Sequence, residues 1–301
     1  MHPRNKNIGP YDLDQMVMAE PLLEKYITIN PAGNKTINFS DPKAVKRLNK
    51  AILKHYYKIS YWEFPDTNLC PGIPGRANYI HIAADILKKD NQNIIPTGDK
   101  VKCLDIGTGA TCIYPLIGTA EYGWSFIGTE VDGASLKSAE NIISKNEGMN
   151  NLVSLRFQKK PKSIFRNIIK KDELFDISIC NPPFHSNKKE AAKAAARKQR
   201  NLKGKRSQPL NFSGNNHELV FEGGELKFIT KMIEESKAFG NQVRWFTSLV
   251  SKEKSLNSLT RLLEKYSPQK VNSIPTGTGN KKSRILAWTY MKDSKRIHNI
   301  D

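Results

Sequence analysis

Residues 101–111, VKCLDIGTGAT, place an apolar run, one acidic residue and two glycines directly before an amphipathic stretch. The run 101–105 has the pattern of a buried β-strand, and a helix is predicted at 112–121. Gly107 and Gly109 would let the backbone approach a ligand closely at the N-terminus of that helix. We therefore expect a ligand-binding turn. Two glycines in this spacing also occur in NAD-binding enzymes, but the third glycine of the dinucleotide fingerprint is missing, which disfavours NAD.

The alternation of apolar runs and amphipathic stretches continues toward the C-terminus, as in a sheet built from βαβ units. Seven strands, of which the last two close as a hairpin, fit an α/β class I S-adenosylmethionine methyltransferase better than a plain Rossmann domain. This Rossmann-like fold has a seven-stranded sheet, mostly parallel, with a final antiparallel hairpin. Beyond the first strand and helix, strands are expected at 125–130, 152–157, 175–180, 243–248, 269–275 and 284–291, and helices at 133–146, 163–170, 225–239 and 256–265.

Residues 1–95 are expected to form an N-terminal helical extension, and residues 96–301 the methyltransferase domain. One helix is predicted at 41–57, with Asp41 as its N-cap and Pro42 at its first position. A second is predicted at about 78–88, after a turn-rich connector at 69–75.

The charge of the chain indicates a polyanionic partner. It has 48 Lys and Arg against 29 Asp and Glu among 301 residues, a net charge of +19. Clustered cations bind nucleic acids because they neutralise phosphates and release counterions. A basic insert at about 185–224 is expected to hold RNA beside the loop at 181–184, although a solvated loop is the alternative. Its segment 186–206 carries Lys188, Lys189, Lys193, Arg197, Lys198, Arg200, Lys203, Lys205 and Arg206.

The sequence also restricts the location and the cofactor class. Its N-terminus has no apolar secretory segment, and no apolar run approaches the roughly 18–20 residues that span a bilayer. The four cysteines lack the paired spacing of zinc sites, so no metal is expected. These features predict a cytoplasmic protein.

Strand 175–180 is followed by Asn181, Pro182, Pro183 and Phe184. Side chains at the carboxyl end of a central parallel strand point into the ligand crevice. The Asn181 side-chain oxygen and the Pro182 carbonyl can each accept a hydrogen from an exocyclic amino group, and the prolines hold the loop rigid. Phe184 offers a face for a planar base. The pattern predicts methyl transfer to an amino group, with a proline-rich structural turn as the alternative.

Two acids end the first two strands of the predicted sheet. Glu130 follows Asp105 by 25 residues and can accept hydrogen bonds from both hydroxyls of a ribose. A solvated loop acid is the alternative for Glu130. Asp105 is expected to organise the turn and to meet the amino acid part of the cofactor.

Six stretches of the chain are characteristic: MHPRN at 1–5, FSDPKAV at 39–45, PGRANYIH at 74–81, IYPLIG at 113–118, NPPFH at 181–185 and WFTSLVS at 245–251. In these stretches the chain resembles the bacterial 23S rRNA adenine-N6 methyltransferase family, RlmF. The eukaryotic methyltransferase-like protein sixteen is similar in its core. The resemblance implies adenine N6 as the acceptor, at position 1618 of 23S rRNA in the family's nomenclature.

The resemblance also implies roles for single residues. Arg76 would hold the cofactor carboxylate, Gly107 and Thr111 would line the turn, and Glu130 would bind the ribose. Asn181 would be the catalytic acceptor. The expected cofactor-binding set is Arg76, Asp105, Gly107, Thr108, Gly109, Thr111, Glu130 and Gln158, the last for the cofactor's adenine, and Arg4 and Lys6 would contact RNA.

The expected partner is 23S rRNA or a large-subunit assembly intermediate, bound by a monomer. Guanine N2 in rRNA, a glutamine amide in a protein and a catalytically inactive RNA-binding assembly factor are the alternatives. The basic insert argues against a protein acceptor.

Overall fold

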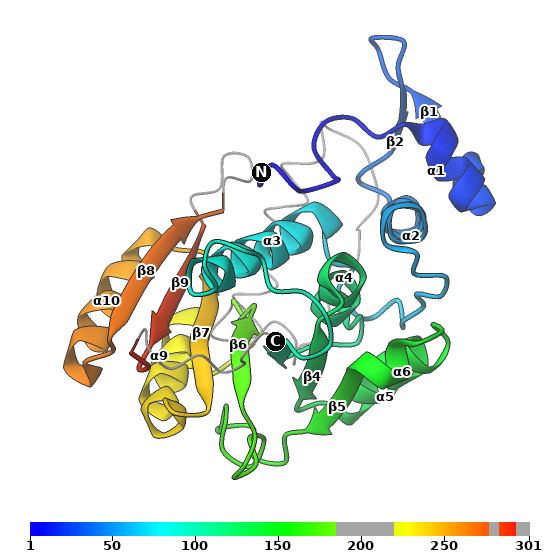
Figure 1. Cartoon of the computed structure of the whole chain (residues 1–301). Helices are drawn as coiled ribbons and strands as arrows, with labels where there is room; N and C mark the ends of the chain where they lie inside the picture. Colours follow the sequence, from blue (N-terminus) through cyan, green and yellow to red (C-terminus); the bar gives the residue numbers. More distant parts are fainter. Residues whose placement is uncertain (185–219, 277–282, 293–301) are drawn as a thin grey trace.

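The central sheet of the computed structural model, which describes residues 1–184, 220–276 and 283–292, has seven strands in the order β5-β4-β3-β6-β7-β9-β8 (Figure 1). Strands β3 to β7 run parallel, whereas β9 pairs antiparallel with β7 and with β8. The predicted α/β fold with its final antiparallel hairpin is confirmed. The strands are β3 (Lys102–Ile106), β4 (Ser125–Glu130), β5 (Val153–Phe157), β6 (Phe175–Cys180), β7 (Val243–Val250), β8 (Lys270–Pro275) and β9 (Arg284–Thr289).

Helices cover both faces of this sheet because successive strand residues point to opposite sides. Cys103 packs in one apolar cluster, and its neighbour Leu104 packs in the other. The first cluster holds the apolar residues of α2 (Pro42–Tyr57), α3 (Ile73–Lys89), α4 (Ile113–Tyr122), α5 (Gly133–Ser144) and the short α6 (Met149–Leu152). The second holds those of α9 (Gly224–Ser236), the 3₁₀ helix η2 (Lys237–Phe239) and α10 (Glu253–Tyr266).

The helices of the N-terminal region follow the capping signals in part. Asp41 caps α2 by accepting a hydrogen bond from the Lys43 N–H at 2.9 Å, as predicted. Helix α3 begins at Ile73, inside the expected connector, because Pro74 suits a first helical turn. This helix packs against α4 and β6.

Four short elements near the N-terminus were not predicted. They are the helix α1 (Leu13–Ala19), the 3₁₀ helix η1 (Pro21–Tyr26), and the antiparallel pair β1 (Ile27–Ile29) and β2 (Lys35–Ile37). The β1–β2 pair extends away from the central sheet at the upper edge of Figure 1.

The predicted helix at 163–170 is wrong. Residues 161–170 form a series of turns, in which the N–H groups of Ile164, Phe165 and Arg166 all point to one carboxylate oxygen of Glu235. Buried backbone N–H groups need hydrogen-bond acceptors. The Glu235 carboxylate provides one for these three groups, so they do not need the carbonyl acceptors of a helix. The apolar residues that suggested a helix, Ile164 and Phe165, are buried beside α9.

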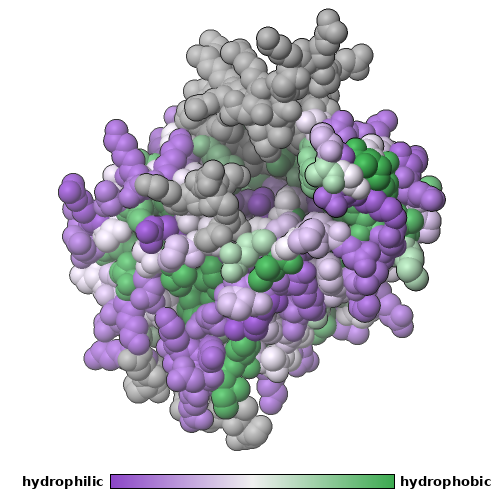
Figure 2. Space-filling view, turned by 90° about the horizontal axis from the view of Figure 1, so that it is seen from above, coloured by the Kyte–Doolittle hydropathy of each residue, from purple (hydrophilic) through white to green (hydrophobic). Residues whose placement is uncertain are grey.

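The face of the molecule in Figure 2 is mainly hydrophilic where it is coloured, with smaller hydrophobic areas between. Within the described residues, every helix is too short or too polar to cross a membrane.

Candidate functional site

A cavity of about 820 Å³ lies at the carboxyl ends of β3, β4 and β6. Its volume is in the range of roughly 300–1,000 Å³ that is usual for small-molecule and cofactor sites. Nearly all of the residues expected to bind cofactor or to act in catalysis line it, although Asp105 does not. Those that do are Arg76, Gly107, Thr108, Gly109, Thr111, Glu130, Gln158, Asn181, Pro182, Pro183 and Phe184.

The turn after β3 needs its two glycines for their backbone conformation. Gly107 has φ of 72° and Gly109 has φ of 65°, a left-handed region that residues with a Cβ rarely adopt. The turn is tied to the neighbouring strand, because the Thr108 N–H donates to the Thr129 carbonyl at 2.9 Å. The Gly107 and Gly109 N–H groups also donate within the protein, to Thr129 Oγ1 at 3.4 Å and to Glu130 Oε2 at 3.0 Å, so the turn is held in place where it lines the cavity.

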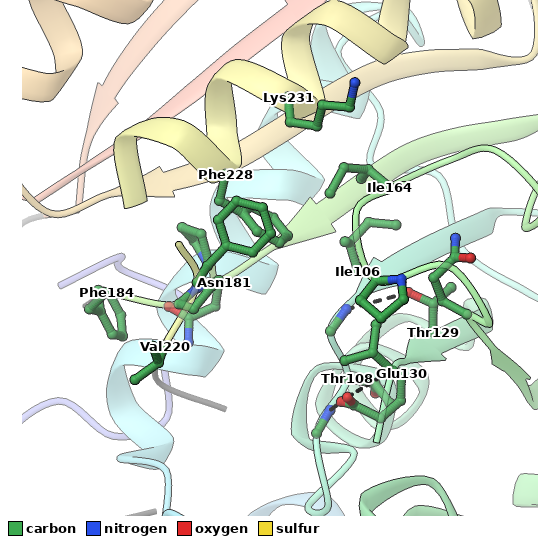
Figure 3. Close-up of a pocket in the computed structure, with 18 of the residues that line it drawn as sticks. Ile106, Thr108, Thr129, Glu130, Ile164, Asn181, Phe184, Val220, Phe228 and Lys231 are labelled. Atoms are coloured by element: carbon green, nitrogen blue, oxygen red, sulfur yellow. Dashed lines mark hydrogen bonds between the residues drawn. The ribbon is translucent and has the colours of Figure 1, made fainter. Parts of the chain in front are cut away.

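Glu130 is held in place by three backbone donors. Its Oε2 accepts from the Gly109 N–H at 3.0 Å, and its Oε1 accepts from the N–H groups of Val131 at 2.8 Å and Asp132 at 3.0 Å. The side chain is buried, yet it borders the cavity (Figure 3). Glu130 is therefore not a solvated loop acid, and its carboxylate is pre-organised next to the glycine turn.

Asp105 lies beneath the turn and is almost completely buried. Burial is the main cause that raises the pKa of its carboxyl to about 7; the Thr108 side chain opposes this rise, and the negative charge of Glu130 adds to it. Burial disfavours the charged form of an acid, so Asp105 titrates near neutral pH. A cation that enters the cavity above it would favour its ionised form.

Asn181 stands at the end of β6 with an unused acceptor. Among the described residues, none donates a hydrogen bond to its buried Oδ1. A buried oxygen without a donor has a free-energy cost, which a ligand with an N–H group removes. Phe184, Asn181 and Phe228 gather on one side of Figure 3, and Thr108 and Glu130 lie on the other. The arrangement suits a planar ring that carries an amino group.

Tyr79 of α3 supports the start of the Asn181 loop, a role that the sequence alone did not indicate. Its hydroxyl lies 3.4 Å from both the N–H and the carbonyl oxygen of Cys180, and 2.9 Å from Oγ1 of Thr247. Thr247 in turn donates to the Ser178 carbonyl at 2.6 Å. These contacts fix the residue that precedes Asn181.

Helix α9 forms a wall of the cavity that sequence reasoning missed. It contributes Phe228, Lys231 and the buried Glu235, while Ile164 and Arg166 line the cavity from the turn after β5. No local motif marks these residues. They line the same cavity as the Asn181 loop only through the tertiary fold, in which the turn after β5 donates hydrogen bonds to Glu235 of α9.

The expected RNA contacts fall into two groups. Arg4 forms an ion pair with Asp85 at 2.8 Å and donates to Tyr122, and Lys6 pairs with Glu121 at 2.9 Å. Both cations are thus engaged within the protein, and RNA contact by them stays a prediction. The basic residues 188–206 of the insert lie outside the described residues.

Comparisons with known proteins cover nearly the whole chain. A family model described as RNA methyltransferase matches residues 1–292. The chain is 47% identical to "Ribosomal RNA large subunit methyltransferase F" of Cytophaga hutchinsonii, over 96% of this chain and 91% of the relative. It is also 47% identical to the protein of the same name from Escherichia coli strain SMS-3-5, with coverage of 98% and 95%.

Solved structures of human METTL16 are also similar to this chain over nearly its whole length. The catalytic domain of human METTL16 in complex with the MAT2A 3′UTR hairpin 1 is 30% identical, with a TM-score of 0.82 and coverage of 97% of this chain and 96% of that domain. The N-terminal domain of human METTL16 in complex with SAH is 28% identical, with a TM-score of 0.76 and coverage of 97% and 99%.

These matches confirm the resemblance found in the sequence, the methyltransferase fold and S-adenosylmethionine as its cofactor. The cavity agrees with that cofactor, because the Glu130 carboxylate, the glycine turn and the Arg76 side chain line one space. With its seven-stranded fold and a family match from residue 1 to residue 292, the chain belongs to the RNA methyltransferase family.

Proposed function

We propose that this protein methylates the N6 amino group of an adenine in 23S rRNA, the adenine that the RlmF family numbers 1618. The observation that supports this most directly is the buried Oδ1 of Asn181, which has no donor among the described residues and lies at the end of β6 beside Phe184. An exocyclic amino group would supply the missing donor. The names of the relatives support an rRNA substrate.

The reaction is difficult because the nitrogen of an adenine amino group is conjugated with its ring and is a poor nucleophile. S-adenosylmethionine supplies an electrophilic methyl group when bound. Asn181 accepts a hydrogen bond from the amino group, which favours a pyramidal nitrogen and stabilises the positive charge that develops on it. The rigid Pro182 and Pro183 keep this acceptor in position. The methylated nitrogen is acidic and releases its proton to water.

Other residues bind and orient the two substrates. Arg76 of α3 would hold the cofactor carboxylate, and the Glu130 carboxylate, which lines the cavity, would bind the ribose hydroxyls. Phe184 would stack on the adenine after the base leaves its helix. We place the reaction in the cytoplasm and propose that the enzyme acts as a monomer.

The test is to incubate the protein with rRNA and isotope-labelled S-adenosylmethionine, then to separate the nucleosides by mass spectrometry. We expect labelled N6-methyladenosine. Labelled N2-methylguanosine would instead support guanine as the acceptor. RNA binding without any labelled nucleoside would indicate an inactive assembly factor.

A further inference from the structure

Glu235 is an acid near the C-terminal end of α9 that is almost completely buried. Its Oε2 accepts hydrogen bonds from three consecutive backbone N–H groups, those of Ile164 at 3.0 Å, Phe165 at 3.0 Å and Arg166 at 3.3 Å. Bonds to an ionised acceptor are about twice as strong as neutral ones. Moreover, the acceptor and donors are about 70 residues apart in the chain, so this contact links two distant segments.

The segment that Glu235 holds forms one wall of the cavity. Ile164 and Arg166 line it, and the segment is also held from the other side by Gln158, whose amide N–H donates to the Arg166 carbonyl at 2.9 Å. The Gln158 side-chain oxygen accepts from the Lys160 N–H at 3.0 Å. Hydrogen bonds thus hold the turn after β5 at two points, to Gln158 just after its own strand and to Glu235 of α9.

The position of this wall indicates which part of the cofactor it meets. The glycine turn ends β3, Glu130 ends β4, and the 158–166 turn follows β5, the next strand in the sheet. Ligands of open parallel sheets lie across the carboxyl ends of the strands. If Glu130 binds the ribose, the adenine therefore lies beyond it, against the turn after β5.

We propose that Glu235 is a positioning residue for the cofactor's adenine, which acts by holding the N–H groups of residues 164–166. The proposal rests on the proposed function for the identity of the cofactor. The same helix also contributes Phe228 and Lys231 to the cavity. Glu235 therefore connects α9, which lines the cavity near Asn181, to the 164–166 turn, which would face the cofactor's adenine. A merely structural role would stabilise α9 without setting the affinity for adenosine.

The first measurement is independent of any ligand. Glu235→Gln removes the negative charge but keeps the shape of the side chain, and hydrogen exchange of the 164–166 amides is then compared with wild type. We expect exchange faster by on the order of tenfold, because the N–H groups lose a charged acceptor. Glu234→Gln is the matched control: it removes the same charge one residue away, where the side chain is partly exposed and pairs with Lys231 at 3.7 Å. Its 164–166 amides should exchange as in wild type.

The second measurement tests positioning through two ligands, S-adenosylhomocysteine and 5′-methylthioadenosine, which lacks the amino acid part. Glu235→Gln should weaken both by the same factor, on the order of tenfold, which corresponds to about 1.4 kcal/mol. Arg76→Ala should weaken only S-adenosylhomocysteine. Glu264→Gln, which removes one charge from an exposed position on α10 outside the cavity, should bind both ligands as wild type does, and the melting temperature of each variant reports whether it folds.

The outcomes separate the two proposals. Unchanged exchange at 164–166 in Glu235→Gln, or faster exchange with wild-type affinity for both ligands, would overturn the role of Glu235 in positioning. If wild-type protein binds neither ligand, the proposed function fails, and the exchange experiment still decides whether Glu235 holds the turn. Should Glu235→Gln fail to fold, Glu235→Asp, which keeps the charge but shortens the reach, gives the same comparison.

Discussion

At the scale of single residues, the buried carboxyl of Asp105 makes stability depend on pH. Its pKa is about 7 in the folded protein and near the usual 3.8 when unfolded. Between these values the folded state keeps a proton that the unfolded state has released, so the contribution of Asp105 to stability falls as pH rises from about 4 to 7. Each unit by which the folded-state pKa exceeds the unfolded-state pKa corresponds to about 1.4 kcal/mol in the free energy of unfolding.

Asp105→Asn should therefore raise the melting temperature of the cofactor-free protein at pH 8 relative to wild type, with a smaller difference at pH 5. Thermal unfolding of both proteins across this range is the measurement. A difference that is the same at every pH would show that Asp105 does not titrate in this window. Asp99→Asn, at an exposed position, is the control.

The role of Asn181 gives a second prediction for a single residue. Asn181→Ala should lower the single-turnover rate at least a hundredfold, because removal of one pre-organised acceptor at a developing charge costs about 2.7–4 kcal/mol. Affinity for S-adenosylhomocysteine, measured by isothermal titration, should stay within a few-fold of wild type. Turnover near that of wild type would contradict the catalytic role.

At the scale of elements, Glu130 joins two strand ends. Its carboxylate holds the Gly109 N–H after β3 and the Val131 and Asp132 N–H groups after β4. Glu130→Ala should weaken S-adenosylhomocysteine binding by roughly 1.5–3 kcal/mol, because charge-assisted hydrogen bonds to the ribose are removed. Glu140→Ala, at an exposed position on α5, should leave the dissociation constant unchanged. An unchanged constant in Glu130→Ala would place the ribose elsewhere.

At the scale of the whole molecule, the net charge of +19 predicts salt-dependent RNA binding. Replacing Lys198, Arg200, Lys203, Lys205 and Arg206 with Ser should flatten the slope of log affinity against log salt, by roughly 0.7–0.9 for each RNA phosphate that these side chains neutralise in the wild-type complex. Filter binding at several salt concentrations measures this slope. Affinity for S-adenosylhomocysteine should not change.

The control for this experiment is a second set of five exposed cations on other elements, Lys137, Lys237, Lys254, Arg261 and Lys265, replaced in the same way. An equal decrease of the slope in both sets would mean that only total charge matters. If the insert variant keeps the slope and the affinity of wild type, the RNA surface lies elsewhere, with residues 1–60 as the next region to test.

Local sequence determined most of the fold and one part of the site. The strands of the sheet, the Asp41 cap and the glycine turn depend on neighbouring residues, through alternating burial, capping and permitted φ values. The Asn181 loop was likewise evident from consecutive residues. By contrast, the four short elements before α2 have too few residues for a clear apolar period, and their number and type could not be predicted from it.

Only the tertiary structure decided the turn at 161–170 and the wall formed by α9. The apolar spacing near Ile164 and Phe165 is compatible with a helix, but the backbone instead donates three hydrogen bonds to Glu235, about 70 residues later in the chain. The Tyr79 hydroxyl similarly reaches Cys180 across 101 residues. A periodic pattern reports which side chains are buried, whereas the partner of a buried polar group depends on which distant segments the sheet brings together.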